Sequence, residues 1–193
     1  MPSTTSALLL SVVLVTAGSL VLGHQSRGYA HPIAAPVVSS PAVPAPPWQN
    51  DSWLNVEQPL TLEGLKGKVV LLNFWVFTCY NCTNTVPSLV SFDRRYRARG
   101  LVLIGVHTPE FPPYGGEHDK ANVARALRQY GIEYPVAQDN DSRTWNLYRI
   151  QFWPSFVLID KKGNIRYEGA GEFHLNDTNY RTWDQRIREL LAE

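Results

Sequence analysis

The sequence predicts an α/β domain with a central mixed β-sheet flanked by helices, and three observations support this fold class. The run 69–77 (VVLLNFWVF) is apolar on both faces, as expected for a central strand covered by helices on each side. Segments with strand and helix patterns alternate after it, as they do in α/β sheets. The chain then ends in a predicted hairpin and an amphipathic helix, and the hairpin makes the sheet mixed.

The individual elements follow from local signals along the chain. A short edge strand is expected at 59–62 and a turn at 63–68. A helix is expected at 79–99, closed by Gly100, and a second buried strand at 101–107. After a Pro- and Gly-rich loop at 108–117, we expect a helix at 119–130, a strand at 134–137, a short helix at 142–148, hairpin strands at 155–160 and 165–168, and a final helix at 179–192.

The first part of the chain predicts export. Residues 7–22 are continuously apolar or small, so residues 1–30 are interpreted as a signal peptide or a membrane anchor. A small-x-small site at 28–30 favours cleavage, whereas residues 3–23 could instead remain as a tether to the membrane. Both alternatives place the rest of the chain in the periplasm or another extracytoplasmic space.

Two further parts follow the export segment. Residues 31–47 are rich in Pro and Ala, which predicts an extended, semi-rigid linker. Residues 48–193 are expected to form the single folded domain. The whole chain has 18 Lys and Arg against 17 Asp and Glu, so no strong electrostatic field is available to recruit nucleic acid. We expect a monomer without a nucleic-acid partner.

The only two cysteines, Cys79 and Cys82, stand where the predicted central strand gives way to a helix. The N-terminus of a helix stabilises a thiolate, which favours Cys79 as a nucleophile. A disulfide between the two would close a very short loop and add little stability, so a structural role explains the pair poorly. The spacing predicts a redox dithiol, in which Cys79 attacks a substrate disulfide and Cys82 resolves the mixed disulfide.

Two other chemistries are open to this cysteine pair. A closed zinc site needs two further ligands, and His107, His118 and His174 are scattered along the chain. A copper-binding chaperone that uses both cysteines and one histidine is the second hypothesis. A thiol peroxidase with Cys79 as the reactive residue is the third, although residues 76–78 lack the usual arrangement of Pro and Thr before such a cysteine. We expect no metal and no cofactor.

The dipeptide Trp153-Pro154 precedes the first strand of the predicted hairpin. If its peptide bond is cis, the backbone of residue 153 can pair with an incoming peptide. An ordinary trans proline at the start of an edge strand fits the spacing equally well.

Several motifs together resemble the thioredoxin superfamily. They are Phe74-Trp75, Cys79-x-x-Cys82, Pro87 in the following helix, and Pro154 before the hairpin. The longer phrases at 73–82 (NFWVFTCYNC) and 105–111 (GVHTPEF) resemble exported redoxins of the TlpA type, especially the thioredoxin-like domain of DipZ-type proteins. This resemblance covers roughly residues 53–191.

The resemblance implies a thioredoxin fold and a thiol-disulfide oxidoreductase that reduces protein disulfides outside the cytoplasm. It implies that Cys79 is catalytic, that Cys82 resolves, and that the bond before Pro154 is cis. Trp75, Trp153 and Pro154 would contact the substrate. In DipZ-type proteins such a domain is fused to an electron-carrying membrane domain, so the resemblance implies a separate membrane electron donor here.

The sequence departs from these families at the positions of their acidic groups. Asn73 stands where thioredoxins carry a buried Asp, and Thr78 stands where they carry a Trp. Thr85 occupies the position at which some TlpA-type reductases place a Glu. The resolving cysteine therefore lacks its usual proton acceptor, and Glu110 and His107, near the end of the second buried strand, are the expected substitutes.

Overall fold

The computed structural model describes residues 35–110 and 114–193. The predicted signal peptide or anchor at 1–30, including the candidate tether at 3–23, lies outside these residues. Within the described ranges, no helix combines the length and the apolar character that crossing a membrane requires.

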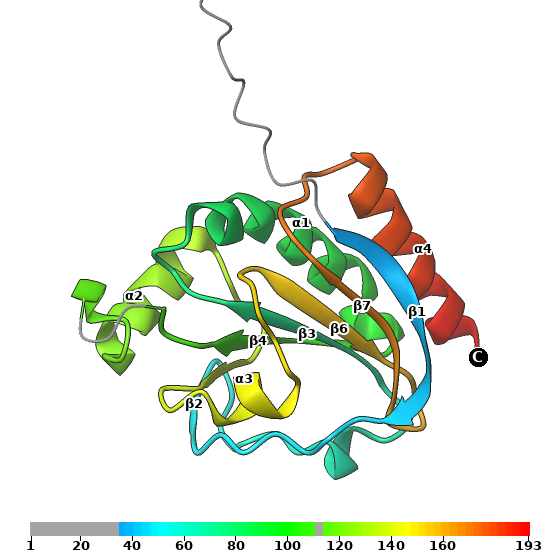
Figure 1. Ribbon diagram of the computed structural model, residues 1–193, viewed down its shortest axis with the longest axis horizontal. Coiled ribbons are helices and arrows are strands. Elements are labelled where there is room, and N and C mark those ends of the chain that lie inside the picture. Colours follow the sequence, from blue (N-terminus) through cyan, green and yellow to red (C-terminus); the bar gives the residue numbers. More distant parts are fainter. Residues whose placement is uncertain (1–34, 111–113) are drawn as a thin grey trace, which may run out of the picture. The chain divides into compact units, whose positions relative to one another are not determined.

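A mixed β-sheet of seven strands forms the centre of the described part. The strands are β1 (Ala35–Pro44), β2 (Ser52–Leu54), β3 (Val69–Trp75), β4 (Leu101–His107), β5 (Val136–Gln138), β6 (Ser155–Ile159) and β7 (Asn164–Ala170). Their order across the sheet is β1-β7-β6-β3-β4-β5-β2, with β3 in the middle (Figure 1). Strands β3, β4 and β5 run parallel, and the remaining pairs are antiparallel. The predicted α/β class with a mixed sheet is confirmed.

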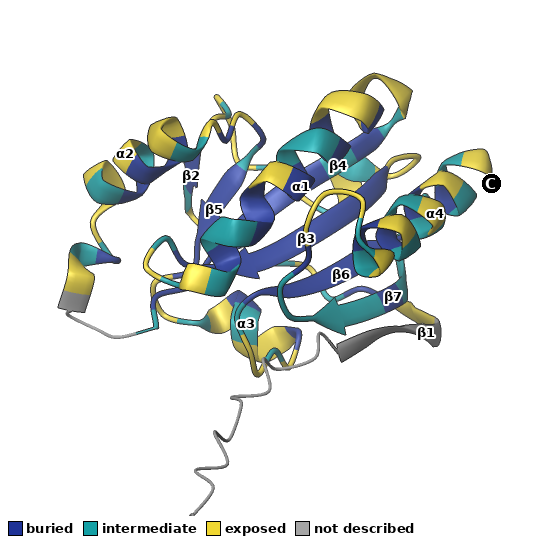
Figure 2. Cartoon of the chain, turned by 90° about the horizontal axis from the view of Figure 1, so that it is seen from above, coloured by how far each residue is buried: buried dark blue, intermediate teal, exposed yellow. Residues whose placement is uncertain are grey.

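Helices cover both faces of this sheet. They are α1 (Tyr80–Tyr96), α2 (Lys120–Tyr130), α3 (Arg143–Leu147) and α4 (Thr178–Ala192), with short 3-10 turns η1 (Glu63–Leu65), η2 (Arg97–Arg99) and η3 (Tyr114–Gly116). Side chains of α1, α2 and α4 share one apolar core with one face of the sheet. On the opposite face, α3 and the segment before β3 contribute to a second core (Figure 2).

Strand β3 explains why both cores exist. All seven of its residues are buried, and successive side chains point to opposite faces. Leu71 and Trp75 enter the core under α1, whereas Leu72 and Phe74 enter the core on the side of α3. The two-faced apolar run in the sequence is therefore the central strand of the sheet, as predicted.

Most predicted elements form within a few residues of their expected bounds. Strand β4 has the predicted limits, and α2 begins after Asp119, whose carboxylate accepts the N–H of Ala121 at 2.7 Å. Helix α1 and the turn η2 together span nearly all of the expected 79–99. Gly100 follows them with φ of +103°, a conformation that favours glycine.

The prediction of an edge strand at 59–62 is wrong. Residues 52–54 form the edge strand β2 instead, and they pair antiparallel with β5. The carbonyl of Leu60 accepts a hydrogen bond from the Trp48 indole at 2.7 Å, and Leu60 and Leu62 pack against the second core. The apolar residues of this stretch therefore cover a face of the sheet and do not extend its edge.

Residues 31–47 are predicted to form an extended, semi-rigid linker, and of these the structure describes residues 35–47. Residues 35–44 are extended, as their Pro content indicates, but they form β1 and pair antiparallel with β7 from Ala35 opposite Ala170 to Pro44 opposite Asn164. Proline is tolerated there because β1 is an edge strand, and an edge strand leaves some N–H positions unpaired. The sheet therefore begins before residue 48.

Candidate active site

Cys79 and Cys82 form a disulfide between the end of β3 and the start of α1, with their Cα atoms 5.2 Å apart. Cys79 is the N-cap of α1, and its sulfur accepts the backbone N–H of Cys82 at 3.3 Å. Cys79 is half-buried, whereas Cys82 is 2% exposed. Free N–H groups at a helix N-terminus stabilise a thiolate, so the reduced chain favours negative charge on Cys79.

The strand register brings three segments to this end of the sheet. Trp75, the last residue of β3, lies opposite His107, the last residue of β4. Because β6 is antiparallel to β3, its first residue, Ser155, lies opposite Phe74. The chain after β3, the chain after β4 and the chain before β6 therefore meet beside the disulfide.

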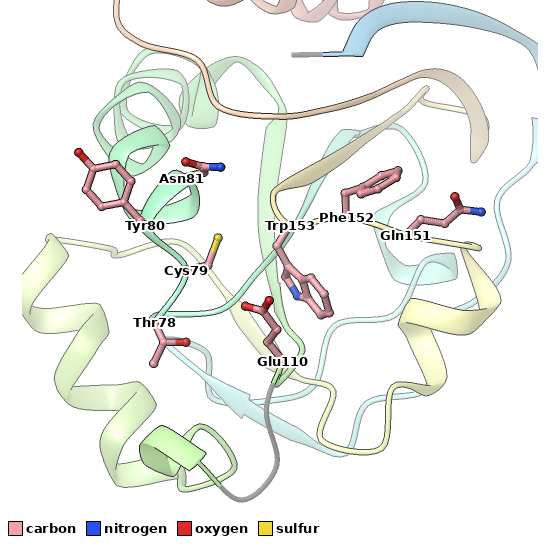
Figure 3. A pocket seen from close by; sticks show the side chains of 8 residues that line it. All are labelled: Thr78, Cys79, Tyr80, Asn81, Glu110, Gln151, Phe152 and Trp153. Atoms are coloured by element: carbon pink, nitrogen blue, oxygen red, sulfur yellow. The ribbon is translucent and has the colours of Figure 1, made fainter. Parts of the chain in front are cut away.

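These three segments line an open pocket of about 490 Å³. Its lining residues are Thr78, Cys79, Tyr80, Asn81, Glu110, Gln151, Phe152 and Trp153 (Figure 3). The carboxyl group of Glu110 points into the pocket between Cys79 and Trp153 (Figure 3). A protein group that reached the pocket would contact Cys79 before Cys82.

Trp153 forms one wall of the pocket, and its peptide bond to Pro154 is cis, as the family resemblance implies. Its indole N–H donates to the Thr108 carbonyl at 3.1 Å, and its ring stacks on Trp145 with centroids 4.0 Å apart. These contacts hold the indole in place from two directions, and its contact with a substrate stays a prediction.

Two aromatic side chains at the pocket are strongly exposed. Tyr80 is 77% exposed and Phe152 is 64% exposed, on either side of Cys79 in the lining. The sequence does not single out Phe152, because an isolated aromatic carries no local signal for exposure. Clustered apolar side chains at a protein surface indicate a contact site for another molecule.

The structure places Trp75 in the core and not at the pocket, although the resemblance implies a substrate contact for it. The side chain is fully buried, and its ring meets the His107 ring edge-on with centroids 5.4 Å apart. Its position in β3 directs it beneath α1. Trp75 therefore supports the site from below and does not line it.

Of the two predicted proton acceptors, only Glu110 lines the pocket. Burial, and then the charge of Glu117, raise the pKa of the Glu110 carboxyl above its usual value. His107 is fully buried, stacks on Phe77, and accepts the Phe77 N–H at 3.4 Å. Burial lowers the pKa of His107 to about 3, so its ring is neutral at neutral pH and is a weak base.

The positions that carry acids in related families carry none here. Asn73 is 1% exposed, and within the described residues its side-chain oxygen has no hydrogen-bond partner. Thr85 is fully buried, and its hydroxyl donates to the carbonyl of Asn81 at 2.8 Å. Neither position supplies a proton acceptor to Cys82.

A buried acid that sequence analysis missed lies close by. Glu117 is 1% exposed, accepts the hydroxyl of Thr78, and accepts the backbone N–H of Glu110 at 2.8 Å. In the sequence it ends a Pro- and Gly-rich loop, where an acidic residue is normally solvated. Only the folded chain brings it beneath the pocket.

The histidines of the copper hypothesis are not brought to the pocket lining. His107 is buried as described, and His174 pairs with Glu172 at 2.8 Å. In the portion of the chain that the structure describes, no group of three or more His, Cys, Asp or Glu side chains is placed to hold a metal ion.

A mixed sheet, a Cys-x-x-Cys disulfide at a helix N-terminus and a cis-proline bond beside it define the thioredoxin-fold class. Residues 41–168 match the AhpC/TSA family, and the chain belongs to that family.

Individual relatives agree with this class. Protein DipZ of Mycobacterium tuberculosis (strain CDC 1551 / Oshkosh) is 41% identical over 143 residues, which are 73% of this chain and 19% of DipZ. Thiol-disulfide oxidoreductase YkuV of Bacillus subtilis (strain 168) is 26% identical over 74% of this chain and 89% of its own length. The solved structure of a thiol-disulfide isomerase from Corynebacterium glutamicum superposes with a TM-score of 0.64 and 26% identity, covering 77% of this chain and 97% of that one.

Proposed function

We propose that this chain is a thiol-disulfide oxidoreductase that exchanges its Cys79–Cys82 dithiol with the disulfides of other proteins. The observation that carries the proposal is the asymmetry of the pair: Cys79 lines an open pocket, and Cys82 is 2% exposed behind it. An accessible thiolate and a shielded partner suit the roles of attack and resolution. The names of YkuV and of the Corynebacterium isomerase support the same activity.

The reaction proceeds in two exchanges. The Cys79 thiolate attacks one sulfur of a substrate disulfide, a bond forms between them, and the other substrate sulfur leaves as a thiolate. Cys82 then loses its proton and attacks the Cys79 sulfur, which forms the intramolecular disulfide and releases the second substrate thiolate. Two electrons pass from the dithiol to the substrate, and the released thiolates take up protons.

Glu110 accepts the proton that Cys82 loses. It lines the same pocket as Cys79, and its raised pKa makes its carboxylate a stronger base than an ordinary one. His107 is the weaker candidate, because burial keeps its pKa near 3 and it does not line the pocket.

We also propose where the protein acts and in which direction electrons flow through it. The apolar segment at 7–22 supports export, with or without a remaining tether at 3–23. The similarity to DipZ supports electron flow from a membrane donor through this chain toward protein disulfides. The chain works as a monomer in this scheme.

Trapping the mixed disulfide tests the activity. Cys82→Ser should accumulate a covalent adduct with a protein disulfide substrate, because Cys79 can still attack but nothing resolves the bond. Mass spectrometry of the full chain after incubation with a disulfide-containing protein measures the adduct. Cys79→Ser, the matched control, should give none.

Other outcomes would point elsewhere. Equal adducts from both variants, or none from either, would contradict the proposed roles. Rapid consumption of peroxide by Cys79 in the wild type, without exchange, would favour a peroxidase. Tight cuprous binding by the dithiol, again without exchange, would favour a copper chaperone.

A further inference from the structure

Glu117 holds together two sides of the pocket. One carboxylate oxygen accepts the hydroxyl of Thr78, the residue immediately before Cys79. The other accepts the backbone N–H of Glu110 at 2.8 Å. One side chain therefore connects the start of the reactive motif to the residue whose carboxyl group points into the pocket.

Both oxygens of the Glu117 side chain are used as hydrogen-bond acceptors. Both of these partners are donors, so each oxygen acts as an acceptor, which the carboxylate does at both positions. Glu117 is 1% exposed, and these two hydrogen bonds offset the cost of burying its polar group. The backbone also comes close here: a Cβ at Gly115, which has φ of +73°, would lie 3.2 Å from the Thr78 methyl group.

We infer that Glu117 is a positioning residue for thiol-disulfide exchange: its carboxylate fixes the backbone of Glu110 against Thr78 and so aims the Glu110 side chain at the dithiol. Glu117 does not contact the reacting sulfurs. This inference rests on the proposed function in one respect, namely that Glu110 is the group that takes the proton from Cys82.

The charge of Glu117 has a second effect on the same residue. A negative neighbour disfavours ionisation, and this charge adds to burial in raising the pKa of Glu110. Besides Glu117, the titratable groups near Glu110 at the pocket are Cys79 and Tyr80. The facing segment 151–153 contributes Gln, Phe and Trp, none of which titrates. Removing the charge at 117 should therefore lower the pKa of Glu110.

The test compares Glu117→Gln with the wild type in the oxidised full chain, where the disulfide-bonded cysteines do not titrate. Carboxyl 13C NMR should show the pKa of Glu110 falling below its wild-type value. Exchange of the Glu110 backbone amide with solvent should speed up about tenfold or more, because its acceptor is weakened. Glu133→Gln is the matched control: it removes the same charge at a side chain that is 64% exposed, and both readouts should stay at wild-type values.

Kinetics of the reduced chain give the functional readout. Glu117→Gln should slow the reaction with a small disulfide by roughly tenfold and shift the Glu110-dependent limb of the pH profile toward lower pH. Glu110→Gln should remove that limb altogether. Thr78→Val removes one donor without changing a charge, and it provides a second variant should Glu117→Gln fold poorly. It should also speed Glu110 amide exchange.

The outcomes separate this inference from the proposed function. An unchanged Glu110 pKa and unchanged amide exchange in Glu117→Gln would overturn the positioning role, whatever the activity of the chain. If Glu117→Gln shows both NMR changes but the wild-type chain exchanges no disulfides, the contact is retained and the proposed function is overturned. A pH limb that survives Glu110→Gln would overturn the link between the two.

Discussion

At the residue scale, the site depends on the different exposure of chemically similar groups. Cys79 and Cys82 carry the same thiol, yet only Cys79 lines the pocket. The acids Glu110 and Glu117 also differ in position. The Glu110 side chain points into the pocket, whereas the Glu117 side chain is buried. The same side-chain chemistry therefore performs different tasks according to its position.

The exposed aromatics Tyr80 and Phe152 lead to a prediction at this scale. Replacing either by Ala should raise KM for a protein disulfide by several-fold, because an exposed ring beside the reactive sulfur contributes binding area. Reaction with a small disulfide, which is too small to span the pocket rim, should change little. Steady-state kinetics with both substrates measure the split.

The chain offers a matched control for this prediction. Leu175 is 49% exposed and does not line the pocket, so Leu175→Ala should leave both reactions unchanged. Equal losses on the large and the small substrate would contradict a docking role for the aromatics and indicate a general disturbance of the site.

At the element scale, the fold rests on the two-faced strand β3 and on the edges that complete the sheet. Strand β3 pairs with β4 on one side and with β6 on the other, so it supplies side chains to both cores. Strand β1 is bound differently, because it pairs with β7 alone. An edge strand of this kind adds stability without forming part of the site.

Removing β1 should therefore cost stability and leave the chemistry intact. A chain beginning at Ala45 should have a free energy of unfolding roughly 2–4 kcal/mol lower than one beginning at Ala35, and a lower urea midpoint, because it loses the ladder between β1 and β7. Equilibrium unfolding of the two reduced chains measures the difference. Identical midpoints would mean that residues 35–44 act only as the linker that the sequence predicts.

The elements also show what sequence reasoning can reach. Local signals suffice for β3, β4 and α2, whose apolar patterns and caps are contained in their own residues. They fail for β1 and β2, because pairing at an edge depends on a partner far away in the chain. Pro-rich residues 35–44 are extended in either case, and only the exposed edge of β7 makes them a strand.

At the scale of the whole molecule, the site exists because three distant segments meet at one end of the sheet. The ends of parallel β3 and β4 and the start of antiparallel β6 lie together by register. The motif at 79–82 and the bond at 153–154 could be recognised in the sequence, and so could Glu110 as a candidate. The contact between Glu117 and Thr78 could not, since no pattern links a loop acid to a residue 39 positions earlier.

The direction of electron flow is also a property of the whole molecule. It depends on the difference in free energy between the reduced chain and the oxidised chain. Burial of Cys82 and the helix N-terminus at Cys79 act on that difference in opposite ways. Their sum is a single number, the reduction potential of the pair.

The equilibrium reduction potential of Cys79–Cys82 in the full chain is the measurement that tests the central claim most directly. Titration against a thiol-disulfide buffer, with the two redox forms resolved by mass spectrometry, should give a two-electron couple near about −270 mV, as expected of a reductase. A value near about −120 mV would contradict the reductase direction and indicate an oxidant of folding proteins. The absence of any two-electron couple would contradict the oxidoreductase itself.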